Sequence, residues 1–302
     1  MRVARLQCAA VPELPDLDVV ADALHAALAG RAVLSVRVSM PLSVRGTPAE
    51  IQDLVDQTLI SARRVGKFLD LQFGRDRIAV NPMLTGRFQL AARGEKAPAG
   101  TALEIVLGAR AGGPPADASS WTAGAVWMAP DDVNAILRYR DPTQMGKVYM
   151  LPKGVTRPVP GREAGEMGPD ALDPGLTLEV WRERIRRHPG ELKNLLRNQA
   201  FVAGIGNAYS DEILFAAGLQ PFRKRSSLAA EEVDAVYNAM REVLATSVAL
   251  LRERVPPTFE KQVRDHLNVH GKGDGPCPRC GGKLTQVSAG GFPTGFCRSC
   301  QH

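Results

Sequence analysis

Four of the chain's five cysteines form two C-x2-C pairs near its C-terminus, and this pattern constrains the fold more than any other feature of the sequence. The four are Cys277, Cys280, Cys297 and Cys300, with sixteen residues between the pairs. Such spacing brings four thiolates around one tetrahedral ion. Two disulfides are the alternative, which a reducing compartment disfavours. We therefore predict one structural Zn²⁺ ion, because four protein ligands leave no coordination position open for chemistry.

The size and composition of the chain limit its class of function. Its 302 residues allow two domains and a small module. Hydrophobic residues make up 44%, and no apolar run is long enough to span a membrane. The first ten residues, MRVARLQCAA, are too short and too interrupted by Arg2 and Arg5 to be a secretory signal. We expect a cytoplasmic protein.

Basic residues are concentrated in one part of the chain, although the net charge is only +6. The cluster comprises Arg182, Arg184, Arg186, Arg187, Lys193 and Arg197, followed by Arg223, Lys224 and Arg225. A basic face of this kind suits a polyanionic partner. The alternative is a solvated helix face, since Glu183 and Glu191 are interspersed.

The pattern of residues divides the chain into successive parts. Residues 12–150 contain short apolar segments typical of strands at 32–40, 68–73, 77–83 and 102–107. Residues 151–175 are rich in proline and glycine and form a linker. Residues 176–265 have helical periodicity, and residues 266–302 hold the cysteine module. We expect an α+β multidomain chain.

A well-defined helix begins close to position 12. Pro15 suits the first helical turn, and the carboxylate of Asp16 favours the positive end of the helix. Apolar residues then recur on one face until Gly30. Residues 1–11 show no comparable pattern, so they read as an extension outside the fold.

The segment LKNLLRNQAFVAGIGNAYSDEILFAAGL predicts two helices joined by a tight turn. Gly204 and Gly206 allow close approach of the backbone, and Asn207 occupies a predicted N-cap position. A helix N-terminus with Lys193 and Arg197 nearby is a candidate phosphate site. The alternative is an ordinary helical hairpin capped by asparagine.

These motifs occur in one order with PELPD, RRVGKFL and MLTGRF, over residues 12–301. Together they resemble the formamidopyrimidine-DNA glycosylase and endonuclease VIII family of bifunctional DNA glycosylases. The resemblance implies an enzyme that excises a damaged base and then cleaves the abasic strand. It also implies an N-terminal β-sandwich with a flanking helix, a C-terminal helical domain with a helix-two-turn-helix motif, and a four-cysteine zinc finger. The partner would be damaged double-stranded DNA in the nucleoid, bound by a monomer.

In this family the nucleophile is an N-terminal proline, which the resemblance places at Pro12. Its amine forms a Schiff base with the sugar, and β/δ-elimination follows. A proline nitrogen inside the chain is an amide whose lone pair is delocalised, so it cannot attack. We expect that residues 1–11 are a start-site artefact or are removed, since Val11 is compatible with a GUG start codon.

The resemblance assigns further roles by position. Glu13 would be the general acid/base, Lys67 would approach the flipped nucleotide, and Asp16 would be an acidic neighbour of the active site. The residues expected to contact DNA are Lys193, Asn207, Leu84, Arg140, Met145 and Arg298.

The sequence departs from the family pattern at several of these positions. Leu84 and Met145 remain apolar wedges, but Thr143 stands where an arginine would pair with the orphaned base. Phe292 or Thr294 stands where the finger would carry a phosphate-binding arginine. The segment 247–262 is shorter than the loop that closes over 8-oxoguanine. We therefore expect a specificity that differs from standard 8-oxoguanine enzymes.

Two other interpretations remain. In one, the chain is a non-catalytic damaged-DNA-binding protein with a blocked Pro12. In the other it is a plain zinc-ribbon DNA-binding protein, which leaves Glu13, Lys67 and the β-rich half unexplained.

Overall fold

The computed structural model describes residues 11–302 apart from 93, 111, 114, 119–124, 126 and 290. The chain forms two compact units. The first contains Pro12, Asp16–Pro158 and Leu251–Gln262, and the second contains Glu13–Pro15, Val159–Leu250 and Val263–His302. The predicted extension at 1–11 lies outside the described residues except for Val11. Within the described part of the chain, no helix has the length and apolarity to cross a bilayer.

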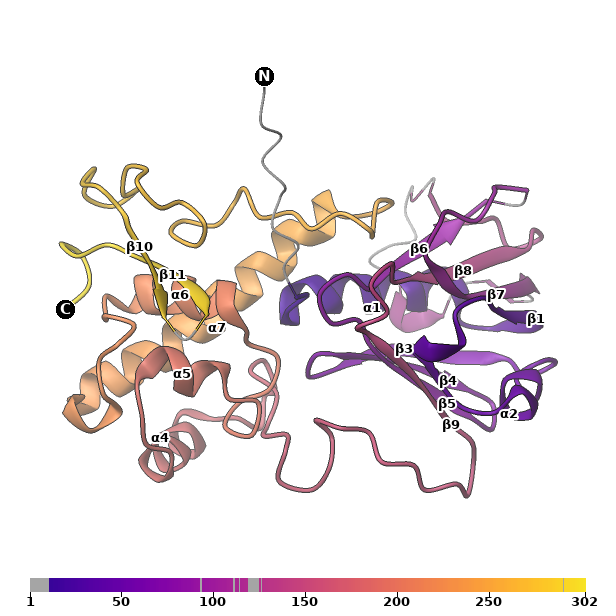
Figure 1. Cartoon of the computed structure of the whole chain (residues 1–302), viewed down its shortest axis with the longest axis horizontal. Helices are drawn as coiled ribbons and strands as arrows, with labels where there is room; N and C mark the ends of the chain where they lie inside the picture. Colours follow the sequence, from indigo (N-terminus) through magenta and orange to yellow (C-terminus); the bar gives the residue numbers. More distant parts are fainter. Residues whose placement is uncertain are drawn as a thin grey trace. The chain divides into compact units, whose positions relative to one another are not determined.

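The first unit is built on two β-sheets, one antiparallel and one mixed, that face each other as layers (Figure 1). One sheet has the order β1-β7-β8-β6 and the other the order β2-β9-β5-β4-β3. Their strands are β1 Arg31–Val38, β2 Val44–Arg45, β3 Leu59–Val65, β4 Phe68–Phe73, β5 Arg77–Asn81, β6 Arg87–Ala91, β7 Thr101–Arg110, β8 Ala135–Arg140 and β9 Lys147–Leu151. Only β2 and β9 pair in parallel. A short helix, α2 Pro48–Gln52, lies between β2 and β3.

Helix α1, Leu14–Leu28, has the predicted position. Pro15 is its second residue. A proline costs no hydrogen bond there, because the backbone N–H groups in the first turn of a helix have no acceptor within the helix. Leu17, Leu24 and Leu28 are buried along it. Gly30 then adopts φ +85°, a left-handed conformation that favours glycine, and the chain turns into β1.

The second unit is mainly helical. Its helices are α4 Leu178–Arg187, α5 Leu192–Arg197, α6 Asn207–Ala217 and α7 Ala230–Arg254, whose last residues, from Leu251 on, belong to the first unit. Trp181, Phe201 and Tyr209 are fully buried in its core. A tight turn joins α5 and α6, as the helix-two-turn-helix prediction requires.

The cysteine module closes the second unit with a hairpin of β10 Thr285–Ala289 and β11 Phe292–Phe296. Its small core packs Val269 and Leu284 with Cys277 and Cys297 against Phe215 of α6. The α+β fold class is therefore confirmed: a β-sandwich, a helix-two-turn-helix region and a four-cysteine module.

Candidate functional site

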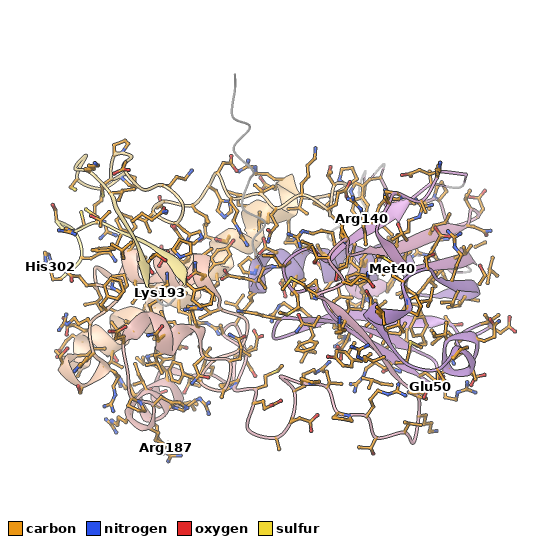
Figure 2. The ribbon with its side chains drawn as sticks, viewed as in Figure 1. Met40, Glu50, Arg140, Arg187, Lys193 and His302 are labelled. Carbon is orange, nitrogen blue, oxygen red and sulfur yellow. The ribbon has the colours of Figure 1, made fainter. Side chains whose placement is uncertain are left out.

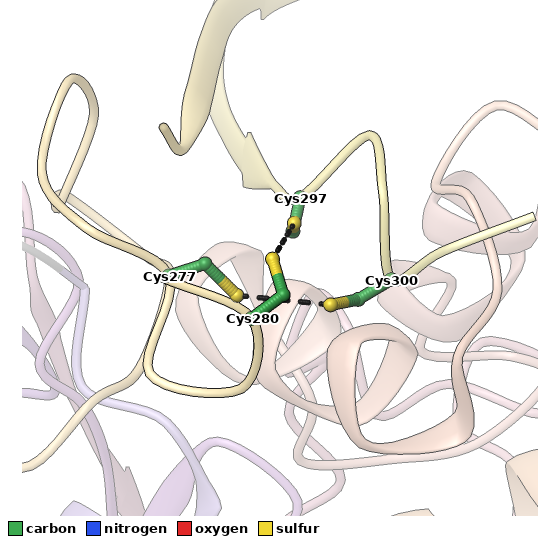
Figure 3. A group of neighbouring side chains, drawn as sticks. All are labelled: Cys277, Cys280, Cys297 and Cys300. Carbon is green, nitrogen blue, oxygen red and sulfur yellow. Dashed lines mark hydrogen bonds between the residues drawn. The ribbon is translucent and has the colours of Figure 1, made fainter. Parts of the chain in front are cut away.

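The four cysteines of the C-terminal module converge on one point (Figure 3). All four sulfur atoms lie within 4.8 Å of one another. The Sγ atoms of Cys277 and Cys300 are 3.8 Å apart, and those of Cys280 and Cys297 are 3.6 Å apart. A disulfide needs about 2.05 Å, whereas two thiolates on one tetrahedral Zn²⁺ lie about 3.8 Å apart. The geometry thus fits a metal ion and excludes two disulfides.

The backbone around Cys277 favours its thiolate. Burial acts to raise the pKa of Cys277, but the N–H groups of Cys280 and Arg279 outweigh it and lower the pKa to about 7. The Arg279 amide donates to the Cys277 sulfur over 3.4 Å. Hydrogen bonds of this kind orient the ligands of structural metal sites.

Pro12 lies buried beside an apolar pocket of the first unit. Leu17, Phe88 and Phe259 line this pocket, and Asp16 contributes a carboxylate to it. Its far side comes from the segment after α7, where Phe259 makes an edge-on contact with the ring of Trp127. The predicted nucleophile and the predicted acidic neighbour therefore share one pocket.

Glu13 is held by the first turn of α6. Its Oε2 accepts the N–H groups of Gly206 at 2.7 Å and Tyr209 at 3.1 Å, and its Oε1 accepts that of Ala208 at 2.8 Å. A side chain at Gly206 would place its Cβ 2.5 Å from the Glu13 carboxyl carbon, so only glycine fits here. Backbone N–H groups of the segment that was predicted to bind phosphate therefore hold the Glu13 carboxylate in position.

This contact corrects two predictions about the turn. Gly206, not Asn207, occupies the N-cap position, and Asn207 is the first residue of α6. Three N–H groups of the helix end bond to Glu13, so they are not the phosphate site that the sequence predicted. The side-chain amide of Asn207 instead donates to the carbonyl oxygen of Pro293 over 2.9 Å.

Lys193 is inside the second unit, with 3% of its surface exposed (Figure 2). Its Nζ donates to Asp211 Oδ1 at 2.6 Å, Thr294 Oγ1 at 2.8 Å and the Pro293 carbonyl at 3.0 Å. These acceptors match the three donors of an ammonium group. Burial lowers the pKa of Lys193, while the charge of Asp211 acts to raise it. The predicted DNA contact therefore ties α5 and α6 to the finger hairpin.

Leu84 and Met145 lie on neighbouring loops of the first unit. The loop with Leu84 follows β5, and the loop with Met145 follows β8. Both loops bond to the buried Asp141, through the hydroxyl of Thr85 in one and the backbone N–H of Gly146 in the other. Met145 is 48% exposed and Leu84 is half-buried. The two loops that carry the predicted wedges are thus joined through Asp141.

The remaining predicted residues are Lys67, Arg140 and Arg298. Lys67 is half-buried in the turn between β3 and β4, next to Gly66. Arg140 ends β8, and its Nε donates to the carbonyl oxygen of Ala99 (Figure 2). Arg298 is exposed between the last two cysteines.

Most of the basic cluster proves to be paired within the protein. Arg182 bonds to Asp234, Arg184 donates to the carbonyls of Ala200 and Phe201, and Arg187 pairs with Glu183. A further pair joins Arg223 and Glu232. These four arginines therefore have partners within the protein itself.

The sequence did not single out Asp211 as part of a site, and it did not show the aromatic partner of Arg197. Asp211 is fully buried and accepts Lys193, His270 Nδ1 and the N–H of Gly295. Arg197 stacks on Phe292 of the finger. The basic cluster was a signal for Arg197, but nothing local in the sequence indicated the partners of either residue.

Comparison with known proteins follows the same division of the chain. A family model described as Formamidopyrimidine-DNA glycosylase N-terminal domain matches residues 11–148. A second, described as Formamidopyrimidine-DNA glycosylase H2TH domain, matches residues 167–255. Formamidopyrimidine-DNA glycosylases of Exiguobacterium sibiricum and Symbiobacterium thermophilum are each 30% identical to this chain over 96% of its length, covering 99% and 89% of those proteins.

Solved structures share the fold at lower identity. Lactococcus lactis Fpg bound to DNA containing N7-benzyl-Fapy-dG superposes with a TM-score of 0.79 at 23% identity, over 96% of this chain and all of that one. The same protein bound to DNA with an abasic site gives a TM-score of 0.79 at 22% identity, over 96% of this chain and 99% of that one.

Proposed function

The chain belongs to the formamidopyrimidine-DNA glycosylase family and is a DNA repair glycosylase, and we propose that it excises oxidised bases and then cleaves the abasic strand by β/δ-elimination. Its partner is double-stranded DNA that contains damaged bases or abasic sites. The observation that carries the proposal is the anchored carboxylate of Glu13, one residue after a proline that lines a pocket.

The nucleophile in this proposal is the ring nitrogen of Pro12. As a free secondary amine it attacks C1′ of the deoxyribose and displaces the base. The amine proton is then lost and the C1′–O4′ bond opens, with a proton taken up on O4′, so that an iminium links protein and sugar. The α-amino group of a chain titrates near neutral pH, so an amine at this place keeps a usable lone pair. The chemistry requires a protein whose first residue is Pro12.

Glu13 acts as the general acid/base. A group that moves protons to and from the sugar must be held at a fixed position near it. The three backbone N–H groups of α6 hold both oxygens of Glu13 in place. Asp16 adds a second carboxylate on the pocket wall beside Pro12. Lys67 is assigned to the nucleotide and its phosphate by the family motif.

The metal in the C-terminal module is Zn²⁺ with a structural role. Cys277, Cys280, Cys297 and Cys300 would hold it, and the sulfur separations of 3.6 Å and 3.8 Å support that assignment. When bound, the ion would hold together the two C-x2-C turns on either side of the finger hairpin. Its four protein ligands leave it no part in the reaction at the sugar.

The two wedge loops support base extrusion. Flipping a base costs a few kcal/mol, which side chains inserted into the duplex offset. The side chains of Leu84 and Met145 are apolar and lie on loops joined through Asp141. Thr143 is too short to pair with the orphaned base, so we propose relaxed opposite-base selectivity.

Trapping with borohydride tests the lyase chemistry. A protein that begins at Pro12 should give a covalent complex with a duplex containing an abasic site, because borohydride reduces the iminium. The matched control keeps residues ahead of Pro12, which makes its nitrogen an amide and should abolish trapping. No trapped complex from the protein that begins at Pro12, alongside normal DNA binding, would favour the alternative of a non-catalytic damaged-DNA-binding protein with a blocked Pro12.

A second test concerns Glu13. Glu13→Gln should slow excision of an oxidised base more than cleavage of an abasic site, because only excision needs both proton transfers. A panel of duplexes with single oxidised purines, oxidised pyrimidines or abasic sites would give both rates and name the preferred substrate. Equal losses in both reactions would contradict the proton role.

A further inference from the structure

Arg197 ends helix α5 with its guanidinium over an aromatic ring of the finger. The Cζ atom lies 3.7 Å from the centroid of the Phe292 ring, at the start of β11. Phe292 is 44% exposed, so this ring is on the surface of the second unit. Stacking on an aromatic face restrains the planar group while leaving its N–H edges available.

The guanidinium of Arg197 makes no hydrogen bond or ion pair with any residue that the structure describes. Its five N–H donors point in fixed directions and need acceptors. Burial lowers the pKa of Arg197, while the charges of Glu13 and Asp211 act to raise it. A partly buried cation with unfilled donors is a strong binding group for an anion.

Arg197 lies on the wall of a cavity of about 220 Å³ in the second unit. Lys193 and Thr294 also line it, but the Lys193 ammonium donates to the Thr294 hydroxyl and to Asp211. The Glu191 carboxylate accepts the side-chain amide of Asn194 over 3.2 Å. Arg197 is therefore the one cation lining this cavity whose donors are not taken up by the described residues.

We propose that Arg197, stacked on Phe292, binds a phosphate of the DNA backbone in place of the buried Lys193. The inference rests on the proposed function and names a contact residue for it. A guanidinium offers two parallel N–H bonds to a phosphate, and contacts of this kind position a protein on the duplex without reading its sequence. The aromatic platform of Phe292 fixes the direction of that fork.

The test compares Arg197→Met with Arg182→Met. Both variants lose one positive charge from the same unit, but Arg182 is paired with Asp234. Binding is measured by fluorescence anisotropy on a duplex with a tetrahydrofuran abasic analogue, over a series of salt concentrations. For Arg197→Met, Kd should rise about tenfold, and the slope of log Kd against log salt should fall by about 0.9, the value for one lost phosphate contact. Arg182→Met should leave both quantities unchanged.

Two further variants separate charge from stacking. Arg197→Lys retains the charge and should preserve the salt slope, with an affinity between those of Arg197→Met and the unaltered protein. Phe292→Leu removes the platform and should weaken binding with little change in slope. An Arg197→Met protein with the unaltered slope and Kd would overturn this inference while leaving the proposed function intact. Failure of the unaltered protein to bind the duplex at all would overturn both.

Discussion

The wedge loops of the first unit and the turn between α5 and α6 of the second unit were both expected to contact DNA. They differ in whether the expected contact residues are exposed or bond within the protein. On the loops, the polar groups of Thr85 and Asp141 bond to each other, and Met145 remains exposed. At the turn, the residues expected to bind, Lys193 and Asn207, bond inward to the finger hairpin.

The difference shows that a motif marks scaffold residues as readily as binding residues. The ammonium of Lys193 supports the hairpin that carries Phe292, and Phe292 in turn supports Arg197. If Arg197 binds a phosphate as we propose, Lys193 positions the surface that Arg197 offers to DNA. A residue that supports the fold is distinguished from one that can bind DNA by the exposure of its side chain and by whether its N–H donors already have acceptors, not by its residue type.

Among these predictions, loss of the metal should have the largest effect on DNA binding, because the finger loses its fold without the ion. In a structural site the binding energy of the metal is folding energy. Cys297→Ser should reduce metal content and weaken DNA binding by at least about 100-fold, as the hairpin that contacts Lys193 and Arg197 loses its shape. Metal analysis by mass spectrometry and anisotropy measure the two effects. Ser299→Ala, between the last two ligands, is the control; metal-free Cys297→Ser with full affinity would contradict the account.

A smaller effect is expected on stability: loss of the buried cation Lys193 should destabilise the protein more than loss of the surface cation Arg182. Lys193→Met leaves Asp211 buried without its ion-pair partner and should lower the free energy of unfolding by about 3–5 kcal/mol. Arg182→Met breaks a pair with an arginine side chain that is 42% exposed, and it should leave that free energy nearly unchanged because solvent screens the pair. Urea denaturation of both variants gives the comparison. Similar losses in the two would mean that Lys193 is not the structural anchor described here.

The smallest effect is expected from a substitution in the wedge loops, and it should slow base excision, the reaction that requires base extrusion. Met145→Ala should slow single-turnover excision of an oxidised base about tenfold, since part of the few kcal/mol for flipping is no longer offset. Cleavage of a preformed abasic site should change less. Leu42→Ala, which alters a 72% exposed leucine outside these loops, is the control. A Met145→Ala enzyme that keeps the normal excision rate would remove this residue from the wedge.

Local patterns predicted those parts of the molecule that depend on near neighbours in sequence. The cysteine spacing predicted the cluster, and the Pro15–Gly30 pattern predicted α1. Strand β8 was missed because the buried Arg138 interrupts its apolar pattern. The acceptor of Arg138, Glu104, lies on β7, 34 residues earlier in the chain.

The partners in the candidate site were beyond sequence reasoning for the same reason. The acceptors of Lys193 in the finger lie 100 and 101 residues further along the chain. The N–H groups that hold Glu13 lie 193 to 196 residues from it. Residue type and order indicated which groups matter, but their partners depend on how distant segments pack.

The most direct test of the central claim is the location of the covalent bond formed on trapping. The protein that begins at Pro12 would be reduced with borohydride on abasic-site DNA, digested with nuclease and protease, and analysed by tandem mass spectrometry. We predict that the sugar remnant is attached to the nitrogen of Pro12. A remnant on Lys67 or any other amine, with Pro12 unmodified, would contradict it.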